Sequence, residues 1–301
     1  MRTTADGPAK FRKLLAEKDF LLLPGVYNAL FARVVEELGF PCVYMSGFSV
    51  ATATLGRPDL GMLGLAEMAE QASRIVSAVD IPVLADADTG YGGLFSIRRT
   101  VEEYERAGLA GLHIEDQDLS VKRCGWLGDI EVVSAEAMLE RVRAVLRARR
   151  NEDFFVIART DARRKLGFEE ALRRVRLYAR EGADAVFVEY LTDIEEIRRV
   201  VDAVKIPVVA VVVESEEMLN ADVLKQAGVR IALFPISVLH MTLAAAERVA
   251  RVLREAGTTA ELLPEMVSSE NLLKYIRYRE MAEWESPIRT RPGESTEGKE
   301  R

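Results

Sequence analysis

The chain has 301 residues, of which 49% are hydrophobic and 30% are charged, a composition typical of a globular protein with a substantial core. A formal net charge of −7 argues against a nucleic-acid-binding surface and against a polybasic membrane patch. Cys42 and Cys124 lie far apart and form no zinc-type cluster, which favours a reducing compartment. The chain has no signal-peptide core and no apolar run near the ~18 residues of a membrane span, so we expect a cytoplasmic protein.

Short apolar runs alternate with longer amphipathic stretches along the chain. Continuous apolarity is typical of parallel strands that are covered on both faces. The predicted strands are residues 21–26, 42–47, 82–88, 111–116, 154–161, 185–190, 207–213 and 231–236. Helical patterns separate them, and several of these end in glycine just before the next strand.

This alternation predicts an α/β fold, a (β/α)8 barrel of the TIM type. A doubly wound sheet is the alternative, but the GYGG at 90–93 lacks the spacing of a dinucleotide-binding turn. We expect residues 1–285 to form a single barrel domain that includes extra C-terminal helices. The polar residues 286–301 are expected to form a disordered tail.

Acidic residues follow the predicted third and fourth strands, where barrel enzymes carry their catalytic groups. Asp86 and Asp88 lie two residues apart, so both leave the same side of a strand, and Glu115 ends the next strand. A hard cation such as Mg²⁺ would stabilise these carboxylates, although capping of the following helix is a competing interpretation. Asp59, in the turn GRPDLG, either joins them through water or serves the turn alone.

Groups suited to an anionic substrate end other strands. Ser46 and Gly47 offer a hydroxyl and accessible backbone amides, although the pair is equally consistent with a tight turn. Arg159 ends an apolar strand and needs an anionic partner, for which Glu189 is the expected residue. His113 lies inside a strand and is interpreted as a core histidine with satisfied hydrogen bonds, with a ligand role as the alternative.

The loop SVKRCGWL carries Cys124 directly after Lys122 and Arg123. Neighbouring cations favour the thiolate, and Gly125 allows close backbone approach to a ligand. An unreactive loop cysteine is the alternative that this stretch alone leaves open. Trp126 is interpreted either as a lid residue over the pocket or as a packing residue.

Six motifs carry a family resemblance that runs over residues 10–285. They are YMSG (44–47), LGRPDLG (55–61), VLADADTGYGG (83–93), GLHIEDQ (111–117), KRCG (122–125) and ARTDA (158–162). In order and spacing they resemble the isocitrate lyase and phosphoenolpyruvate mutase superfamily, and within it the short 2-methylisocitrate lyase group. The resemblance implies retro-aldol cleavage of a 2-hydroxy carboxylate with Mg²⁺, or alternatively Mn²⁺, as the cofactor.

The resemblance also implies roles for individual residues. Asp88 would be the direct metal ligand, with Asp59, Asp86 and Glu115 acting through water. Cys124 would protonate the carbanion left by bond cleavage, and Lys122 and Arg123 would stabilise charge nearby. The implied substrate-binding set is Ser46, Gly47, Phe48, Gly125, Arg159, Glu189, Val211, Val213 and His240. The implied assembly is a homotetramer whose C-terminal helices are exchanged between subunits.

Several positions depart from the 2-methylisocitrate lyase pattern. Trp126 stands where these lyases have histidine, and Val211 and Val213 stand where they have asparagine and threonine. His240 and Ser269 align with two arginines that bind distal carboxylates. Because buried carboxylates need donors, these changes favour a smaller or more apolar acid, such as an alkyl-substituted malate, over methylisocitrate.

Two alternatives compete with the lyase. An oxaloacetate decarboxylase or a phosphonate-handling mutase would use the same metal site, but neither needs a thiol acid in the KRCG loop. A non-catalytic barrel is the second alternative. It is disfavoured because a drifting site would not preferentially keep its metal-binding carboxylates.

Overall fold

The computed structural model describes residues 6–125, 129–214 and 219–289. The chain forms two compact units, Met1–Glu247 and Arg248–Arg301. Most of the expected tail at 286–301, and Trp126, lie outside the described residues. The single-domain boundary at 285 stays a prediction. Within the described part, none of the helices combines the length and apolarity needed to span a bilayer.

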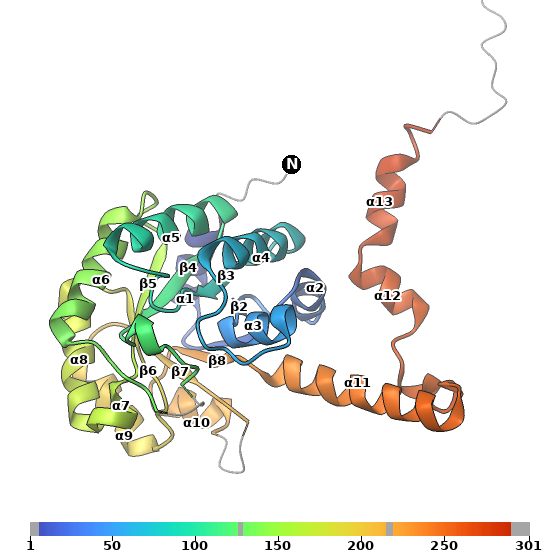
Figure 1. Cartoon of the computed structure of the whole chain (residues 1–301). Helices are drawn as coiled ribbons and strands as arrows, with labels where there is room; N and C mark the ends of the chain where they lie inside the picture. Colours follow the sequence, from blue (N-terminus) through green and yellow to red (C-terminus); the bar gives the residue numbers. More distant parts are fainter. Residues whose placement is uncertain (1–5, 126–128, 215–218, 290–301) are drawn as a thin grey trace, which may run out of the picture. The chain divides into compact units, whose positions relative to one another are not determined.

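The first unit is a closed barrel of parallel strands that pair in chain order, with β1 returning to β8 (Figure 1). The strands are β1 Leu21–Val26, β2 Val43–Met45, β3 Val83–Asp86, β4 Gly111–Glu115, β5 Phe155–Thr160, β6 Ala185–Val188, β7 Val208–Val211 and β8 Ile231–Phe234. The predicted (β/α)8 barrel and all its strands are thus confirmed. Most strands end up to two residues earlier than predicted, because the polar residues that follow them turn away from the ladder into the loops.

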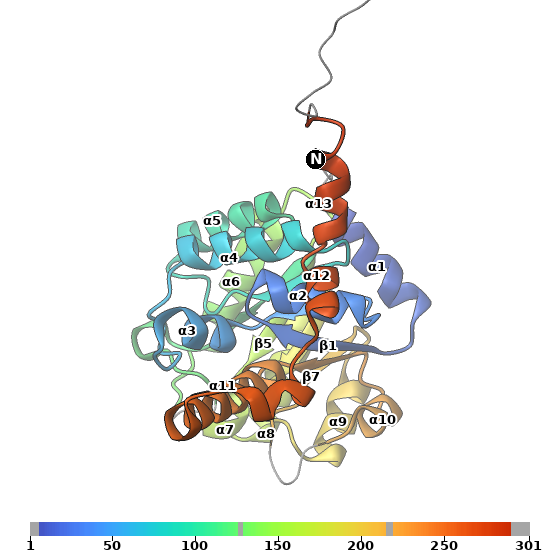
Figure 2. The ribbon, with the colours of Figure 1, turned by 90° about the vertical axis from the view of Figure 1, so that its right-hand side faces the viewer.

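Helices surround these strands on the outside (Figures 1 and 2). In the first unit they are α1 Gly7–Glu17, α2 Ala29–Glu37, α3 Gly47–Leu55, α4 Leu65–Ala78, α5 Leu94–Ala107, the 3-10 helix η2 Leu119–Val121, α6 Ala135–Ala148, α7 Ala162–Leu166, α8 Phe168–Glu181, α9 Ile194–Ala203 and α10 Ala221–Gln226. Helix α11, Ser237–Ala256, begins in the first unit, and the second contains η3 Ala260–Glu265, α12 Ser269–Tyr275 and α13 Tyr278–Glu285.

The core has two layers. One lies between the strands and the surrounding helices, and the other fills the inside of the barrel. Phe11 of α1 belongs to the inner layer, fully buried, with its ring centroid 5.0 Å from that of Phe155 at the start of β5. Helix α1 therefore covers the N-terminal end of the barrel. The C-terminal end, where the predicted functional groups lie, is left for the site.

A buried carboxylate joins two strands to a covering helix at that end. Asp116, which follows β4, accepts hydrogen bonds from Thr160 Oγ1 (2.6 Å), the Asp161 backbone N–H (2.8 Å), Arg174 Nη1 (2.8 Å) and the Tyr178 hydroxyl (2.9 Å). Arg174 and Tyr178 come from α8. Because Asp116 is fully buried, these donors replace the water that a carboxylate would otherwise require.

We expect Asp116→Ala to lower the free energy of unfolding by about 3 kcal/mol, because it leaves buried donors and a cation without their shared acceptor. The figure is at the low end for broken buried pairs, since Glu170 still contacts Arg174 Nε at 2.8 Å. Urea unfolding measures the change. Asp202→Ala, at an exposed aspartate of α9, is the control and should shift the value by less than about 0.5 kcal/mol. Equal stability of the two variants would contradict the role of Asp116.

Candidate active site

A cavity of about 260 Å³ lies at the C-terminal end of the barrel. Every predicted catalytic, metal-binding and substrate-binding residue lines it except Gly47. Gly47 lies directly behind the lining, since a Cβ there would stand 2.6 Å from Asp86 Oδ2. The additional lining residues, which the sequence did not single out as pocket residues, are Tyr44, Phe187, Glu214, Leu233, Pro235 and Ile236. The structure thus brings the predicted residues to one place.

Asp86 and Asp88 lie at and just beyond the end of β3. The Asp88 N–H donates to Asp86 Oδ1 at 2.8 Å, which fixes the Asp86 carboxylate relative to the Asp88 backbone. Asp88 has a φ of 47°, a left-handed conformation that is rare outside glycine and that tends to occur at functional sites. Glu115 pairs in register with Arg159 across β4 and β5 and is almost fully buried.

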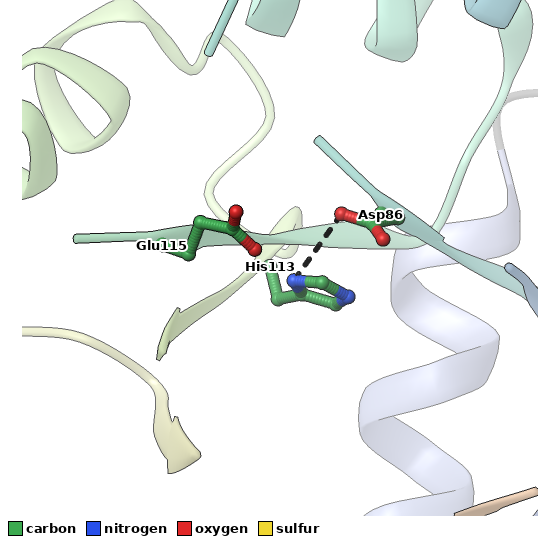
Figure 3. A group of neighbouring side chains, drawn as sticks. All are labelled: Asp86, His113 and Glu115. Carbon is green, nitrogen blue, oxygen red and sulfur yellow. Dashed lines mark ion pairs between the residues drawn. The ribbon is translucent and has the colours of Figure 1, made fainter. Parts of the chain in front are cut away.

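Figure 3 shows Asp86, His113 and Glu115, whose ligand atoms all lie within 4.8 Å of one another. Burial raises the pKa of Asp86 and Glu115, and raises that of Asp88 to about 7. Among the described residues, Glu115 Oε1 has no hydrogen-bond donor. Buried carboxylate oxygens without enough donors fit a hard divalent cation, which prefers oxygen ligands.

His113 is buried, as predicted, but only one of its ring nitrogens is hydrogen-bonded. Its Nε2 lies 2.7 Å from the Tyr44 hydroxyl, whereas Nδ1 lies 3.6 Å from Asp86 Oδ1 and makes no hydrogen bond within the described chain. Burial lowers the pKa of His113 well below its usual range, so the ring is neutral. The expectation of a satisfied core histidine therefore holds for one nitrogen only, and the other faces the acidic cluster.

Lys122 contacts the acidic cluster. Its Nζ lies 2.7 and 2.8 Å from the two carboxylate oxygens of Asp59 and 2.7 Å from Asp88 Oδ1. The sequence predicts a cation that acts near the thiol of Cys124, and the structure adds that its Nζ contacts the carboxylates. Asp59 is therefore part of the cluster rather than only a turn residue. Lys122 is buried, and it supplies positive charge where carboxylates crowd.

The segment that carries Cys124 is held through its backbone. The Arg123 N–H donates to Gln117 Oε1 at 3.1 Å, and the Cys124 N–H donates to the Asp59 carbonyl at 3.0 Å. Gly125 packs so closely that a Cβ there would lie 2.9 Å from the Glu189 side chain. This close approach explains the glycine. Cys124 itself is half-exposed at the edge of the cavity.

Arg159 presents the buried guanidinium of the site. Asp161 holds it in a two-pronged contact, from Nε at 2.9 Å and Nη2 at 2.8 Å, while Glu115 lies at 3.3 Å and Glu189 at 3.4 Å. The predicted partner, Glu189, is thus one of three acidic neighbours and the most distant. Asp161 fixes the plane of the guanidinium, which leaves Arg159 oriented toward the cavity that it lines.

Ser46 begins helix α3 beside the acidic cluster. Its Oγ accepts a hydrogen bond from the Ser49 N–H at 3.2 Å, so it caps the helix, and the alternative of a simple tight turn is wrong. Gly47 is the first helical residue, and its lack of a side chain lets the helix terminus approach Asp86. Helix termini of this kind present backbone N–H groups to anions.

The opposite wall is largely apolar. It is formed by Val211, Val213, Leu233, Pro235 and Ile236. Its polar members are Glu214, which accepts a hydrogen bond from the Ser237 hydroxyl, and His240, which is exposed at the rim. Among the described lining residues, the lysine and arginine side chains are Lys122, Arg123 and Arg159.

Strand alternation could have assigned to the site several residues that the sequence reasoning did not place there. Tyr44 lies two residues before Ser46, and His113 lies two before Glu115. Phe187 likewise precedes Glu189 by two. Residues two apart on a strand share a face, so each of these follows from its polar neighbour.

Comparison with known proteins places this geometry in a family. The family model for phosphoenolpyruvate phosphomutase matches residues 11–254. The chain is 38% identical to 2-methylisocitrate lyase of Shewanella oneidensis over 277 residues, 91% of this chain and 94% of that protein. It is also 38% identical to 2,3-dimethylmalate lyase of Eubacterium barkeri, over 86% of this chain and 90% of that protein.

A solved structure of oxaloacetate acetylhydrolase in complex with the inhibitor 3,3-difluorooxalacetate superposes with a TM-score of 0.89 at 35% identity, over 95% of this chain and 98% of that one. The resemblance read from the motifs is confirmed. The chain belongs to the phosphoenolpyruvate mutase/isocitrate lyase superfamily.

Proposed function

We propose that the protein is a Mg²⁺-dependent carbon–carbon lyase that cleaves a 2-hydroxy di- or tricarboxylate to pyruvate or glyoxylate and a second carboxylic acid. The observation that carries the proposal is the convergence of three groups on one cavity: a buried carboxylate cluster, the oriented guanidinium of Arg159 and the half-exposed thiol of Cys124. A retro-aldol cleavage needs all three groups. The carboxylates hold the metal, the guanidinium binds the acid end of the substrate, and the thiol protonates the carbanion.

The cation would be held by Asp88 directly and by Asp86, Asp59 and Glu115 through water, with Mn²⁺ as an alternative to Mg²⁺. When bound, the ion supplies Lewis-acid polarisation of the substrate's oxygens. In the chain itself, Lys122 holds positive charge against Asp59 and Asp88. This contact supports the assignment, because crowded carboxylates that attract an ammonium group also favour a metal cation.

The 2-hydroxy acid end of the substrate would be bound by Arg159, Ser46 and the first backbone amides of α3, at Gly47 and Phe48. The 2-hydroxyl passes its proton to one of the carboxylates that line the cavity, C2 becomes a carbonyl, and the C2–C3 bond breaks with its electrons passing to C3. Cys124 Sγ–H then donates its proton to C3. Arg123, which lines the same cavity, is placed to pair with the carboxylate next to that carbon.

The apolar wall favours an alkyl-substituted malate among the 2-hydroxy acids. Val211 and Val213 offer no donor, and the carboxylate of Glu214 would repel a further negative charge. A substrate with alkyl groups would bury them there, at roughly 0.8 kcal/mol for each CH₂. A tricarboxylate would lack a partner for its distal group among the described lining residues.

An enzyme acting on oxaloacetate is the second candidate, and the similarity to oxaloacetate acetylhydrolase favours it over a mutase. Such an enzyme would release oxalate and acetate by hydrolysis, or CO₂ by decarboxylation. A non-catalytic barrel is disfavoured by the retained carboxylates, arginine and thiol around one cavity.

With Mg²⁺ present, we expect the protein to cleave 2,3-dimethylmalate or another alkylmalate to a 2-oxo acid. Methylisocitrate, isocitrate and oxaloacetate are tested in parallel, and mass spectrometry identifies the products of each. Cys124→Ser should lower kcat at least 100-fold, roughly the loss of one general acid, with metal binding unchanged. Cys42→Ala, at the buried thiol, is the control and should keep its activity. Equal turnover in Cys124→Ser would exclude the thiol acid, and turnover of oxaloacetate alone would establish the second candidate.

Asp88→Ala should abolish the Mg²⁺ dependence of thermal stability. For the unmodified chain, Mg²⁺ at a hundred times its Kd should stabilise the fold by about 2.7 kcal/mol and raise Tm accordingly. Asp80→Ala, an exposed aspartate before the same strand, should retain the full shift. An unchanged Mg²⁺ titration in Asp88→Ala would exclude this residue as the direct ligand.

We also propose the cytoplasmic location and the homotetramer with exchanged C-terminal helices. The second unit exposes large apolar side chains that an exchange would cover. They are Leu272, Leu273, Ile276, Tyr278, Met281 and Trp284. Light scattering should give four times the chain mass, and Met281→Asp combined with Trp284→Asp should reduce it. A monomeric mass for the unmodified chain would contradict the assembly.

A further inference from the structure

Gln117 connects the segment that carries Cys124 to the carboxylate that orients Arg159. Its side-chain Nε2 donates to Asp161 Oδ1 at 2.9 Å, and its Oε1 accepts the Arg123 N–H at 3.1 Å. The residue is 1% exposed. A single buried amide therefore bridges the two halves of the site.

The orientation of this amide is fixed by its partners. The Arg123 backbone N–H can only donate, so it requires the amide oxygen. Asp161, paired with Arg159, can only accept, so it requires the amide nitrogen. Among uncharged side chains of this length, glutamine is the one that supplies both functions at once. A carboxylate would repel Asp161, and an apolar side chain would leave the Arg123 N–H unsatisfied.

The main chain of Gln117 is anchored independently of its side chain. Its carbonyl accepts a hydrogen bond from Arg141 Nη1 at 2.8 Å, and the residue forms an antiparallel bridge with Val132. Substitution of the side chain therefore tests the bridge and leaves the backbone path of the loop in place.

Two consecutive backbone amides fix the position of the thiol. The Cys124 N–H is held by the Asp59 carbonyl, on the side of the acidic cluster. The Arg123 N–H is held by Gln117, on the side of Arg159. We propose that Gln117 is a positioning residue that fixes the Cys124 segment against the Arg159–Asp161 ion pair, so that the proton donor and the group that binds the substrate's acid end keep a constant separation.

This inference rests on the proposed function for its kinetic consequence but not for its structural one. The protonation step depends on where Sγ stands relative to the substrate, and small misplacements of catalytic groups cost rate more than affinity. Loss of the bridge should therefore reduce kcat. Substrate affinity should change little, because Asp161 still pairs with Arg159 through both nitrogens.

The test compares Gln117→Met with the full-length protein in Mg²⁺. Methionine keeps the length and volume of the side chain but removes both hydrogen bonds. We expect the rate of Cys124 alkylation by iodoacetamide to rise about fivefold, the equivalent of one net hydrogen bond of about 1 kcal/mol. The buried Cys42 serves as an internal reference in the same mass spectrum. We expect kcat to fall at least tenfold and KM to stay within twofold.

Gln71→Met is the matched control, since the Gln71 side-chain amide donates to the backbone carbonyl of Tyr27, and neither residue is among those that line the cavity. It should match the unmodified chain in alkylation rate and kcat. Gln117→Asn, one methylene too short to make both contacts, serves if the methionine variant does not fold, and the same changes are expected of it.

An unchanged Cys124 alkylation rate in a folded Gln117 variant would overturn the inference. A rise in KM at constant kcat would also overturn it, by assigning Gln117 to substrate binding alone. The alkylation readout needs no turnover. If the unmodified protein cleaves none of the acids, the proposed function fails while the position of Cys124 is still tested.

Discussion

The balance of buried charge at the C-terminal end of the barrel is the constraint on which the rest of the site depends. Among the described residues, buried acidic side chains there outnumber buried basic ones. The acids are Asp59, Asp86, Asp88, Glu115, Asp116, Asp161 and Glu189, and the bases are Lys122, Arg159 and Arg174. Such an excess is costly unless donors or cations meet each carboxylate. The raised pKa values of Asp86, Asp88 and Glu115 express that cost.

The structure meets this constraint in two different ways. Around Asp116 and Asp161 the donors are built into the fold, so those carboxylates orient their neighbours and have little capacity left for a ligand. Around Asp86, Asp88 and Glu115 the donors are fewer, and the buried cations Lys122 and Arg159 supply positive charge. The first group is suited to positioning, and the second to holding a cation. Gln117 joins the first group to the Cys124 segment, because its amide donates to Asp161 and accepts from the Arg123 N–H.

Much of this arrangement could be predicted from the sequence. Continuous apolar runs identified the strands, and polar residues directly after them identified the site, because parallel strands of a barrel end on one face. Contacts between loops could not be predicted in this way. Lys122 precedes Cys124 by two residues, yet it reaches Asp59 and Asp88, which are distant in sequence. The predicted partner of Arg159, Glu189, is confirmed as an ion pair, but the closer partner, Asp161, was not predicted. Asp161 lies two residues further along the same chain segment, where its side chain shares the face of Arg159, whereas Glu189 only borders it.

The two ends of the cavity come from different parts of the barrel. The acidic cluster, Ser46 and Arg159 lie at or just beyond the ends of β2 to β5, whereas the apolar wall lies at or just beyond the ends of β7 and β8. Residues after different strands can change independently, because the barrel's hydrogen-bond ladder does not depend on their side chains. A chain can therefore keep the groups that decide which bond is broken while it exchanges those that decide which acid is bound. Val211 and Val213 are consistent with such an exchange, because they change the wall opposite the acidic cluster and leave the cluster itself in place. If the proposed function holds, the bond-breaking chemistry and the acid specificity of this chain are set at separate strands, and a change of substrate would require no change in the half proposed to hold the metal.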